Sequence, residues 1–261
     1  MAESNEAMSR RIPGSVTGMA GEGAHSIPTG QESVKRVRPA PEPVSLLSSR
    51  PVPPSLIETV RVTNGTAPLW NLHLGRLRES CGKLGIGFPT LVPPHGGSDR
   101  VCRYEIRPDG VGLSERQVGP VTPLRLVTAR VPHKPYPFKT NDRACFAEAR
   151  TEADAAGAQD AVLLTSQGWV AEGTIWSLCW WEMNLLAAPA LSLLILPGIG
   201  RARLKALRGH IVERRVTRRA LSGVPVFLVN AARGVVEVES WDGEQVPRHP
   251  GTARLAAQFW S

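Results

Sequence analysis

The chain has 261 residues, of which 42% are hydrophobic and 21% charged, and this composition excludes a wholly disordered, collagen-like or coiled-coil protein. Lysine and arginine outnumber aspartate and glutamate by 31 to 23, which gives a net charge of +8. The arginines are scattered, aromatic residues are 5% and zinc-finger spacing is absent, so we expect no nucleic-acid partner. The excess positive charge is instead typical of a solvated, arginine-rich surface, and it would also attract anionic small molecules.

Residues 1–54 are expected to form a disordered, proline-rich tail. They contain eight prolines and no Phe, Tyr or Trp. Such a segment cannot bury enough apolar surface to offset about 1–2 kcal/mol of backbone entropy per ordered residue. We expect no signal peptide there, because residues 1–20 have no apolar core segment.

Residues 55–131 are expected to form a small α+β domain. Residues 57–62 alternate and are rich in β-branched side chains, which predicts a strand. Residues 69–85 have apolar side chains at helical spacing. Further strands of this domain are predicted at 101–107 and 124–130.

Residues 132–261 are expected to form a larger domain. A proline-rich bridge over 132–137 precedes a helix predicted at 143–156. Residues 160–166 and 169–175 are predicted to form a hairpin. The other predicted elements are strands at 176–181, 185–188, 224–229 and 235–240, and a helix that opens at Arg201 after a loop over 196–200.

The stretch 175–200 is strongly apolar. Its uncharged part, 185–200, has 16 residues and two prolines, whereas a membrane helix needs about 20 residues. Two buried strands joined by a turn at Glu182-Met183-Asn184 are therefore predicted, and no membrane partner is expected.

The cysteines predict a reducing compartment. No two of them are spaced as Cys-x-x-Cys, which favours buried reduced thiols in a cytoplasmic protein over a disulfide or metal site. The four are Cys81, Cys102, Cys145 and Cys179.

Two residues have side chains suited to catalysis. Lys139 follows Pro137-Phe138 and has Arg143 four residues further on. An amine in apolar surroundings near other cations has a lowered pKa and can form a Schiff base. Glu172 lies in an apolar strand region, where a carboxylate needs a partner such as a cofactor's protonated ring nitrogen. The alternatives are an ordinary surface lysine and a solvent-facing glutamate.

Two further features suit an anion. The loop 198–200 opens a helix, whose free N–H groups and dipole attract negative charge. Arg76 places a cation on the apolar stripe of its helix, where a buried guanidinium needs a partner. That partner would be a bound phosphate or carboxylate, or else an acidic residue of another element in a salt bridge. His73, on the same helix, is predicted to be a packed helix histidine and not a catalytic acid or base.

The order of these features resembles the class IV aminotransferases, the fold-type IV enzymes that use pyridoxal 5′-phosphate. The resemblance covers about residues 56–260. It implies an α+β fold with a small N-terminal domain, a larger β-barrel-like C-terminal domain with flanking helices, and a homodimer that binds a small-molecule substrate. The segments that carry it are Glu58-Thr59-Val60-Arg61-Val62, His73-x-x-Arg76-Leu77-x-x-Ser80, Lys139-Thr140-x-x-Arg143, Gly168-Trp169-Val170-x-Glu172, Leu196-Pro197-Gly198-Ile199-x-Arg201 and Asn230-Ala231-x-Arg233-Gly234.

The resemblance also implies roles for individual residues. Lys139 would bind the cofactor covalently and move protons, and Glu172 would hold the ring nitrogen protonated. Arg76 would bind the phosphate together with the backbone N–H groups of Ile199 and Gly200. The remaining expected cofactor contacts are Ser177, where the family usually has Asn, and the backbone at Ala231.

Within the family, Lys139-Thr140-x-x-Arg143 and Ala231 look like 4-amino-4-deoxychorismate lyase, which releases pyruvate and makes 4-aminobenzoate for folate. Arg107, Arg143 and Ala232 are the candidate substrate contacts, although Arg143 could equally form a structural ion pair. A true aminotransferase acting on amino acids and 2-oxo acids is the alternative. A non-catalytic member of the fold is a third reading, because the family's usual N-terminal signals are not found before the first strand.

Overall fold

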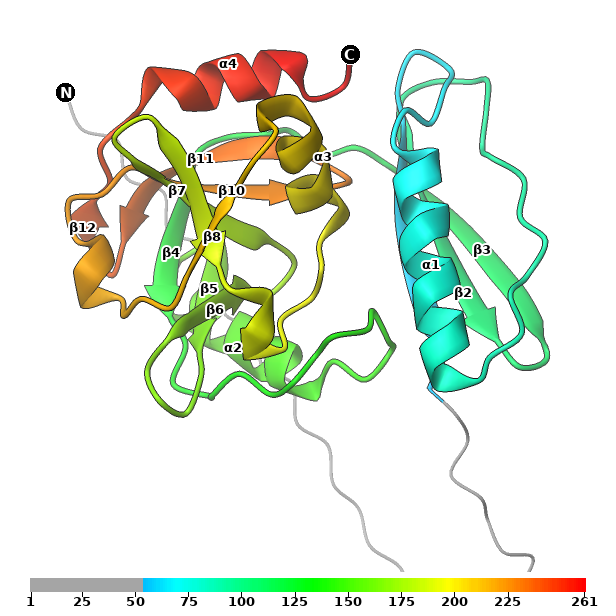
Figure 1. Ribbon diagram of the computed structural model, residues 1–261, viewed down its shortest axis with the longest axis horizontal. Helices are drawn as coiled ribbons and strands as arrows, with labels where there is room; N and C mark the ends of the chain where they lie inside the picture. The colour runs from blue at the N-terminus through cyan, green and yellow to red at the C-terminus, as the bar shows by residue number, and fades with distance from the viewer. Residues whose placement is uncertain (1–53) are drawn as a thin grey trace, which may run out of the picture. The chain divides into compact units, whose positions relative to one another are not determined.

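The computed structural model describes residues 54–261, which Figure 1 draws as a coloured ribbon. The tail predicted over 1–54 lies outside these residues, apart from its last position. The described residues form two sheets, one of three strands and one of nine.

The smaller sheet is antiparallel, in the order β1-β2-β3, and one helix packs against it (Figure 1). The helix and the first two strands confirm the elements predicted for residues 57–107. β3 was not predicted from the sequence: Val111 and Leu113 are its only large apolar residues, and none of its residues is fully buried. The elements are β1 (Leu56–Val62), α1 (Trp70–Leu84), β2 (Arg100–Arg107) and β3 (Gly110–Gln117).

The two faces of β1 have different surroundings. Val60 and Val62 are completely buried in the core beneath α1, and Glu58 lies on the same face. Ile57 and Thr59 point the opposite way, as the alternation of side chains along a strand requires, and line the cavity described below. β1 therefore separates a small apolar core from that cavity.

The larger sheet curls, and its strand order is β6-β5-β4-β11-β10-β7-β8-β9, with β12 paired to β11 (Figure 1). The pairs β4–β5, β4–β11 and β8–β9 are parallel and the others antiparallel. The fold is thus mixed α+β, as predicted. The strands are β4 (Leu124–Thr128), β5 (Asp160–Leu164), β6 (Val170–Gly173), β7 (Ser177–Glu182), β8 (Leu185–Pro189), β9 (Val212–Arg214), β10 (Val226–Asn230), β11 (Gly234–Trp241) and β12 (Glu244–Gln245).

Both faces of the larger sheet are covered. On β10, Val226 and Leu228 face one apolar core while Phe227 and Val229 face the other, which explains why the strand is a continuous apolar run. Three helices pack on the sheet: α2 against β5, α3 against β10 and α4 against β11. The helices are α2 (Ala144–Ala155), α3 (Ile199–Arg208) and α4 (Pro250–Gln258), with short 3₁₀ helices at Leu191–Leu193 and Arg219–Leu221.

Strand β4 lies in a different sheet from the one predicted. Residues 124–130 were expected to complete the small domain over 55–131, but β4 pairs with β5 and β11 of the larger sheet. The alternation of apolar residues predicts a strand with one buried face and does not specify which sheet it joins. The small sheet therefore ends at Gln117.

The apolar stretch 175–200 forms strands, as predicted. β7 and β8 pair in an antiparallel hairpin, and Met183 takes a positive φ of 55° in its turn. Within residues 54–261, none of the helices is both long and apolar enough to span a membrane. All four cysteines are free and buried, which agrees with their prediction as reduced thiols.

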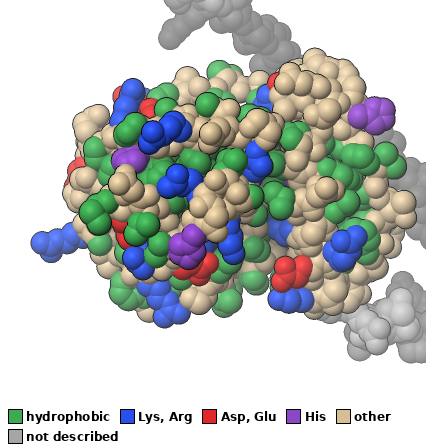
Figure 2. Space-filling model, turned by 45° about the horizontal axis from the view of Figure 1, so that its top comes forward, with side chains coloured by type: hydrophobic (Ala, Val, Ile, Leu, Met, Phe, Trp, Pro, Cys, Tyr) green, Lys and Arg blue, Asp and Glu red, His purple; other side chains and the backbone are tan. Residues whose placement is uncertain are grey.

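Positive charge is spread over the surface. Figure 2 shows lysine and arginine side chains distributed across the visible face, with fewer acidic side chains between them. This distribution matches the scattered arginines of the sequence.

Candidate functional site

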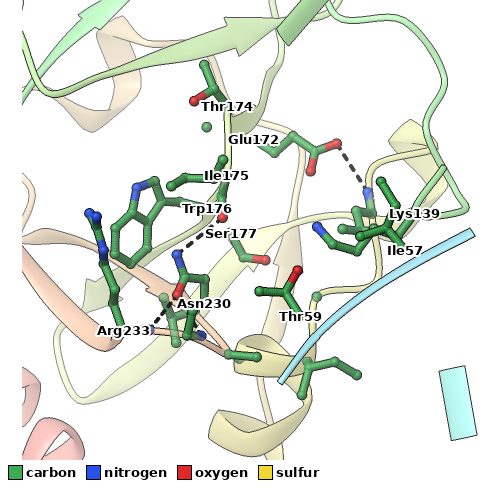
Figure 3. Close-up of a pocket in the computed structure, with 18 of the residues that line it drawn as sticks. Ile57, Thr59, Lys139, Glu172, Thr174, Ile175, Trp176, Ser177, Asn230 and Arg233 are labelled. Atoms are coloured by element: carbon green, nitrogen blue, oxygen red, sulfur yellow. Dashed lines mark hydrogen bonds between the residues drawn. The ribbon is translucent and has the colours of Figure 1, made fainter. Parts of the chain in front are cut away.

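A cavity of about 210 Å³ is lined by residues of both sheets (Figure 3). The smaller sheet contributes residues of β1, β2 and β3, and α1 contributes Arg76. The larger sheet contributes residues of β6, β7 and the β10–β11 turn, together with the start of α3. Most of the residues singled out from the sequence meet at this cavity.

Lys139 is held at the cavity by the backbone of β1. The Ile57 N–H donates a hydrogen bond of 2.7 Å to the Lys139 carbonyl, and the Asn141 N–H donates to the Ser55 carbonyl at 3.0 Å. The amine forms no ion pair or hydrogen bond with any residue in the described part of the chain. Burial, reinforced by the positive charges of Arg76 and Arg143, lowers the pKa of Lys139 to about 7. A free amine with this pKa is a nucleophile at neutral pH.

Glu172 is only 5% exposed and lies on β6. Its Oε1 accepts two hydrogen bonds, from His133 Nε2 at 2.9 Å and from the Leu196 N–H at 3.1 Å. Figure 3 shows the carboxylate of Glu172 on the same side of the cavity as Lys139. Because both donors bind Oε1, the other oxygen has no donor among residues 54–261 and is left to the cavity.

Arg76 forms the salt bridge between elements that the sequence left open for it, and its role as a phosphate ligand stays a prediction. Its Nε and Nη2 donate to Glu58 at 2.9 and 2.6 Å, while Nη1 lies 3.4 Å from the Pro197 carbonyl. Glu58 also contacts His73 Nδ1 at 2.6 Å. Burial by itself would raise the pKa of Glu58, but Arg76 and His73 outweigh it and lower that pKa to about 2. Arg76 is therefore a salt-bridged residue that also lines the cavity.

The start of α3 is an uncapped helix N-terminus in the cavity wall. Gly198 is the N-cap residue, and no side chain accepts hydrogen bonds from the first turn. Ile199 and Gly200 are buried and line the cavity. A Cβ on Gly200 would lie 2.9 Å from Asn230 Cα, so glycine allows α3 to approach the end of β10. Free N–H groups at a buried helix start suit an anion.

The β10–β11 turn lies directly beside the start of α3 and also lines the cavity. Asn230 Oδ1 accepts hydrogen bonds from the Ala232 N–H at 3.0 Å and the Arg233 N–H at 2.8 Å. This arrangement holds the turn in shape, and Ala231 and Ala232 line the cavity. Their roles as cofactor and substrate contacts stay predictions.

Arg143 and Ser177 also line the cavity. Arg143 donates to the Tyr136 hydroxyl at 3.3 Å and to the Thr174 carbonyl, and its guanidinium lies 4.7 Å from the centre of the Phe146 ring. It is thus fixed by polar and aromatic neighbours and forms no ion pair with a carboxylate of residues 54–261. The Ser177 hydroxyl packs against Gly198, where a Cβ would collide with it.

Arg107, a candidate substrate contact from the sequence, is not among the residues that line the cavity. Its side chain is 48% exposed and pairs with Asp109 at 3.4 Å. Arg107 lies on the same face of β2 as Arg103, which does line the cavity. However, four residues separate them, which is about 13 Å along a strand, so Arg107 lies at the hairpin end.

Several residues that line the cavity or contact its lining residues had no functional prediction. Glu58 and His133 make the buried contacts described above, and Arg103, Arg116 and Arg233 line the cavity. For Glu58 a signal exists, because alternation along β1 places it on the core face beside Val60, where a carboxylate needs a partner. No comparable pattern identifies His133, whose partner is 39 residues away.

The donors at the cavity fit pyridoxal phosphate, the cofactor implied by the family resemblance. An amine without a partner can bind an aldehyde, and Arg76 with the uncapped start of α3 can bind a phosphate. The free oxygen of Glu172 can accept a hydrogen bond from a protonated ring nitrogen.

Residues 113–241 match the sequence model of the family described as amino-transferase class IV. No curated protein sequence matches the chain.

Solved structures share the fold. A protein from Legionella pneumophila, solved under the provisional name 4-amino-4-deoxychorismate lyase, is 24% identical with a TM-score of 0.69, and the alignment covers 78% of this chain and 89% of that one. The branched-chain aminotransferase of Thermoproteus uzoniensis is 20% identical with a TM-score of 0.72, covering 79% and 84%. That of Escherichia coli is 19% identical with a TM-score of 0.69, also covering 79% and 84%.

Proposed function

We propose that this chain, which belongs to the class IV aminotransferase family of pyridoxal-phosphate-dependent enzymes, is a lyase that converts 4-amino-4-deoxychorismate to 4-aminobenzoate and pyruvate. The observation that carries the chemistry is the unpaired amine of Lys139, which lines one cavity with Glu172 and the anion site at α3. Bound pyridoxal phosphate would supply an electron-withdrawing ring that acidifies the carbon bearing the substrate's amine.

Different residues of the cavity would bind the cofactor and transfer the proton. Arg76 and the first N–H groups of α3 would bind the phosphate, and Glu172 would bind the ring nitrogen. Lys139 would then take the proton from the amine-bearing carbon of the substrate. Its pKa of about 7 suits an amine that accepts and gives up a proton near neutral pH. The bond between the ring carbon and the ether oxygen would then break, and the ring would become aromatic. The three-carbon group would leave as the enolate of pyruvate and take up the proton held by Lys139 or one from water to become pyruvate.

Arginines at the cavity support the lyase over an enzyme for apolar amino acids. Arg103, Arg116 and Arg233 line the cavity, and none of them forms an ion pair with a carboxylate in residues 54–261. A substrate with two carboxylates would satisfy such cations, whereas a branched aliphatic side chain would not. Arg143 adds a fourth cation near Lys139.

The test uses the purified full-length chain with added pyridoxal phosphate. We expect borohydride reduction and peptide mapping to find the cofactor on Lys139. Incubation with 4-amino-4-deoxychorismate should release one pyruvate per 4-aminobenzoate without any added 2-oxo acid. Lys139→Ala should abolish this release, whereas Lys134→Ala, at an exposed position five residues earlier, should not.

Other outcomes would contradict the proposal. Amino transfer that requires a 2-oxo acid, with no pyruvate released from the lyase substrate, would make the chain an aminotransferase. Failure to take up the cofactor would support a non-catalytic member of the fold.

A further inference from the structure

His133 is a buried histidine in the proline-rich bridge 132–137. Its backbone N–H donates to the Leu164 carbonyl at 2.7 Å, at the end of β5, and the Tyr136 N–H donates to the Leu194 carbonyl at 2.7 Å. These bonds fix the bridge at the histidine itself and three residues after it. The His133 side chain is only 2% exposed, and its ring meets Phe146 edge-on with the ring centres 6.3 Å apart. The imidazole therefore has one defined position.

That position brings the imidazole to Glu172. Nε2 lies 2.9 Å from Oε1, and the Leu196 N–H occupies a second site on the same oxygen. Two donors in different directions prevent the carboxylate from rotating, which leaves the other oxygen to the cavity. The side chain of Glu172 is 7% exposed, so water cannot substitute for a lost donor without entering a nearly closed site.

We propose that His133 is a positioning residue, which orients the Glu172 carboxylate so that its free oxygen meets the ring nitrogen of the cofactor. The proposal rests on the proposed function insofar as that function supplies the ring. Partners that orient a site carboxylate through one hydrogen bond typically contribute about 10–100-fold to binding or activity at metal sites, and we expect a similar range here.

Two amide substitutions separate positioning from packing. The amide of His133→Gln can place a donor where Nε2 lies, whereas that of His133→Asn reaches only the position of Nδ1 and cannot contact Glu172. Both variants lose the imidazole and its contact with Phe146, so they share any cost in packing. His249→Asn is the control, because His249 caps α4 through Nδ1 and stacks on Trp181, and it does not line the cavity.

The main readout is the ¹⁵N chemical shift of cofactor labelled at the ring nitrogen and bound to each variant at pH 7. We expect a protonated-nitrogen shift in the unmodified chain, His133→Gln and His249→Asn, and a shift toward the unprotonated value in His133→Asn. In turnover, kcat of His133→Asn should fall about 10-fold or more with KM changed less than about 2-fold.

The outcomes distinguish this role from the proposed function. A protonated-nitrogen shift and normal kcat in cofactor-loaded His133→Asn would overturn the role of His133, as would equal losses in the Asn and Gln variants. A changed shift in His133→Asn, in a chain that releases no pyruvate, would support His133 and contradict the lyase. An unmodified chain that binds no cofactor would overturn both.

Discussion

Glu58 and Arg76 bind each other through two parallel hydrogen bonds of 2.6 and 2.9 Å, which leave only Nη1 of the guanidinium toward the start of α3. This pairing fixes the plane of the guanidinium before any anion binds. Glu58 also accepts from His73, so one carboxylate aligns two side chains of α1.

Glu58→Gln should therefore weaken cofactor binding. An amide accepts one of the two hydrogen bonds and repels the second donor, so we expect the Kd for pyridoxal phosphate to rise about 10-fold or more. The free energy of unfolding should fall by about 3 kcal/mol, because Arg76 would remain largely buried without its counter-charge. Cofactor titration and urea unfolding measure the two effects. The control is Glu79→Gln, an exposed partner of Lys83, where both quantities should stay nearly constant.

The same carboxylate makes stability depend on acid pH. Unfolded Glu58 takes up a proton near its ordinary pKa of 4.5, whereas folded Glu58 does so only near 2. The unfolded state thus binds more protons between these values, and the free energy of unfolding should fall as pH drops from about 5 to 2, by up to about 3 kcal/mol. Burial also lowers the pKa of His73, which adds to the loss on the acid side. Urea unfolding at several pH values should give a shallower slope for Glu58→Gln; an unchanged slope would assign the acid sensitivity elsewhere.

Lys139 should react with aldehydes at neutral pH. Below its pKa of about 7 the amine is protonated and not nucleophilic, so the rate of cofactor uptake by the apoprotein should rise with pH through a midpoint near 7. Removing a nearby positive charge in Arg143→Gln should move that midpoint upward. Absorbance follows the uptake, and a midpoint that does not move would exclude Arg143 as a cause of the shift.

Gly200→Ala should damage the anion site. Its Cβ would lie 2.8 Å from Val229 Cγ2 and 2.9 Å from Asn230 Cα, so α3 must move away from β10. We expect a loss of about 1–3 kcal/mol in the free energy of unfolding and weaker cofactor binding. In contrast, Gly75→Ala on the exposed face of α1 meets nothing within 4 Å and should stabilise the chain by about 0.5–1 kcal/mol. Equal effects of the two substitutions would contradict the close approach at Gly200.

The cavity arginines should act on substrate and not on cofactor. Arg103→Gln and Arg233→Gln should each raise KM for the dicarboxylate substrate by about 10-fold at low salt, with the Kd for pyridoxal phosphate unchanged. Arg107→Gln, outside the cavity, should leave both constants unchanged. Steady-state kinetics at two ionic strengths checks this, and a loss of cofactor affinity in the Arg233 variant would place that residue at the phosphate instead.

Local sequence patterns predict most of the elements but not how they assemble. The alternation in β1 and the helical spacing in α1 are strong enough to locate both, whereas β3 has only two large apolar residues, Val111 and Leu113, and buries neither. The sheet that β4 joins depends on partners at β5 and β11, which its own residues do not reveal.

For the site, too, the sequence identifies individual residues but not the partners that they contact in the fold. Lys139, Glu172 and Arg76 were identified because a charged side chain in an apolar segment requires a partner. Their partners Glu58 and His133 lie 18 residues from Arg76 and 39 from Glu172, and only the folded chain brings them together. Arg107 was a candidate because an arginine suits a dianionic substrate, and the sequence does not indicate how far along β2 the cavity extends.

The hydrogen bond from the Leu196 backbone to Glu172 joins two parts of the site that the sequence keeps separate. Leu196 directly precedes Pro197 and Gly198, the residues that lead into the anion-binding helix start. Any substitution that shifts this loop to accommodate a different anion will therefore also turn the carboxylate at the far end of the cavity. A substitution in this loop that changes cofactor affinity should therefore also change how Glu172 contacts the cofactor ring, unless the loop and the surroundings of Glu172 are redesigned together.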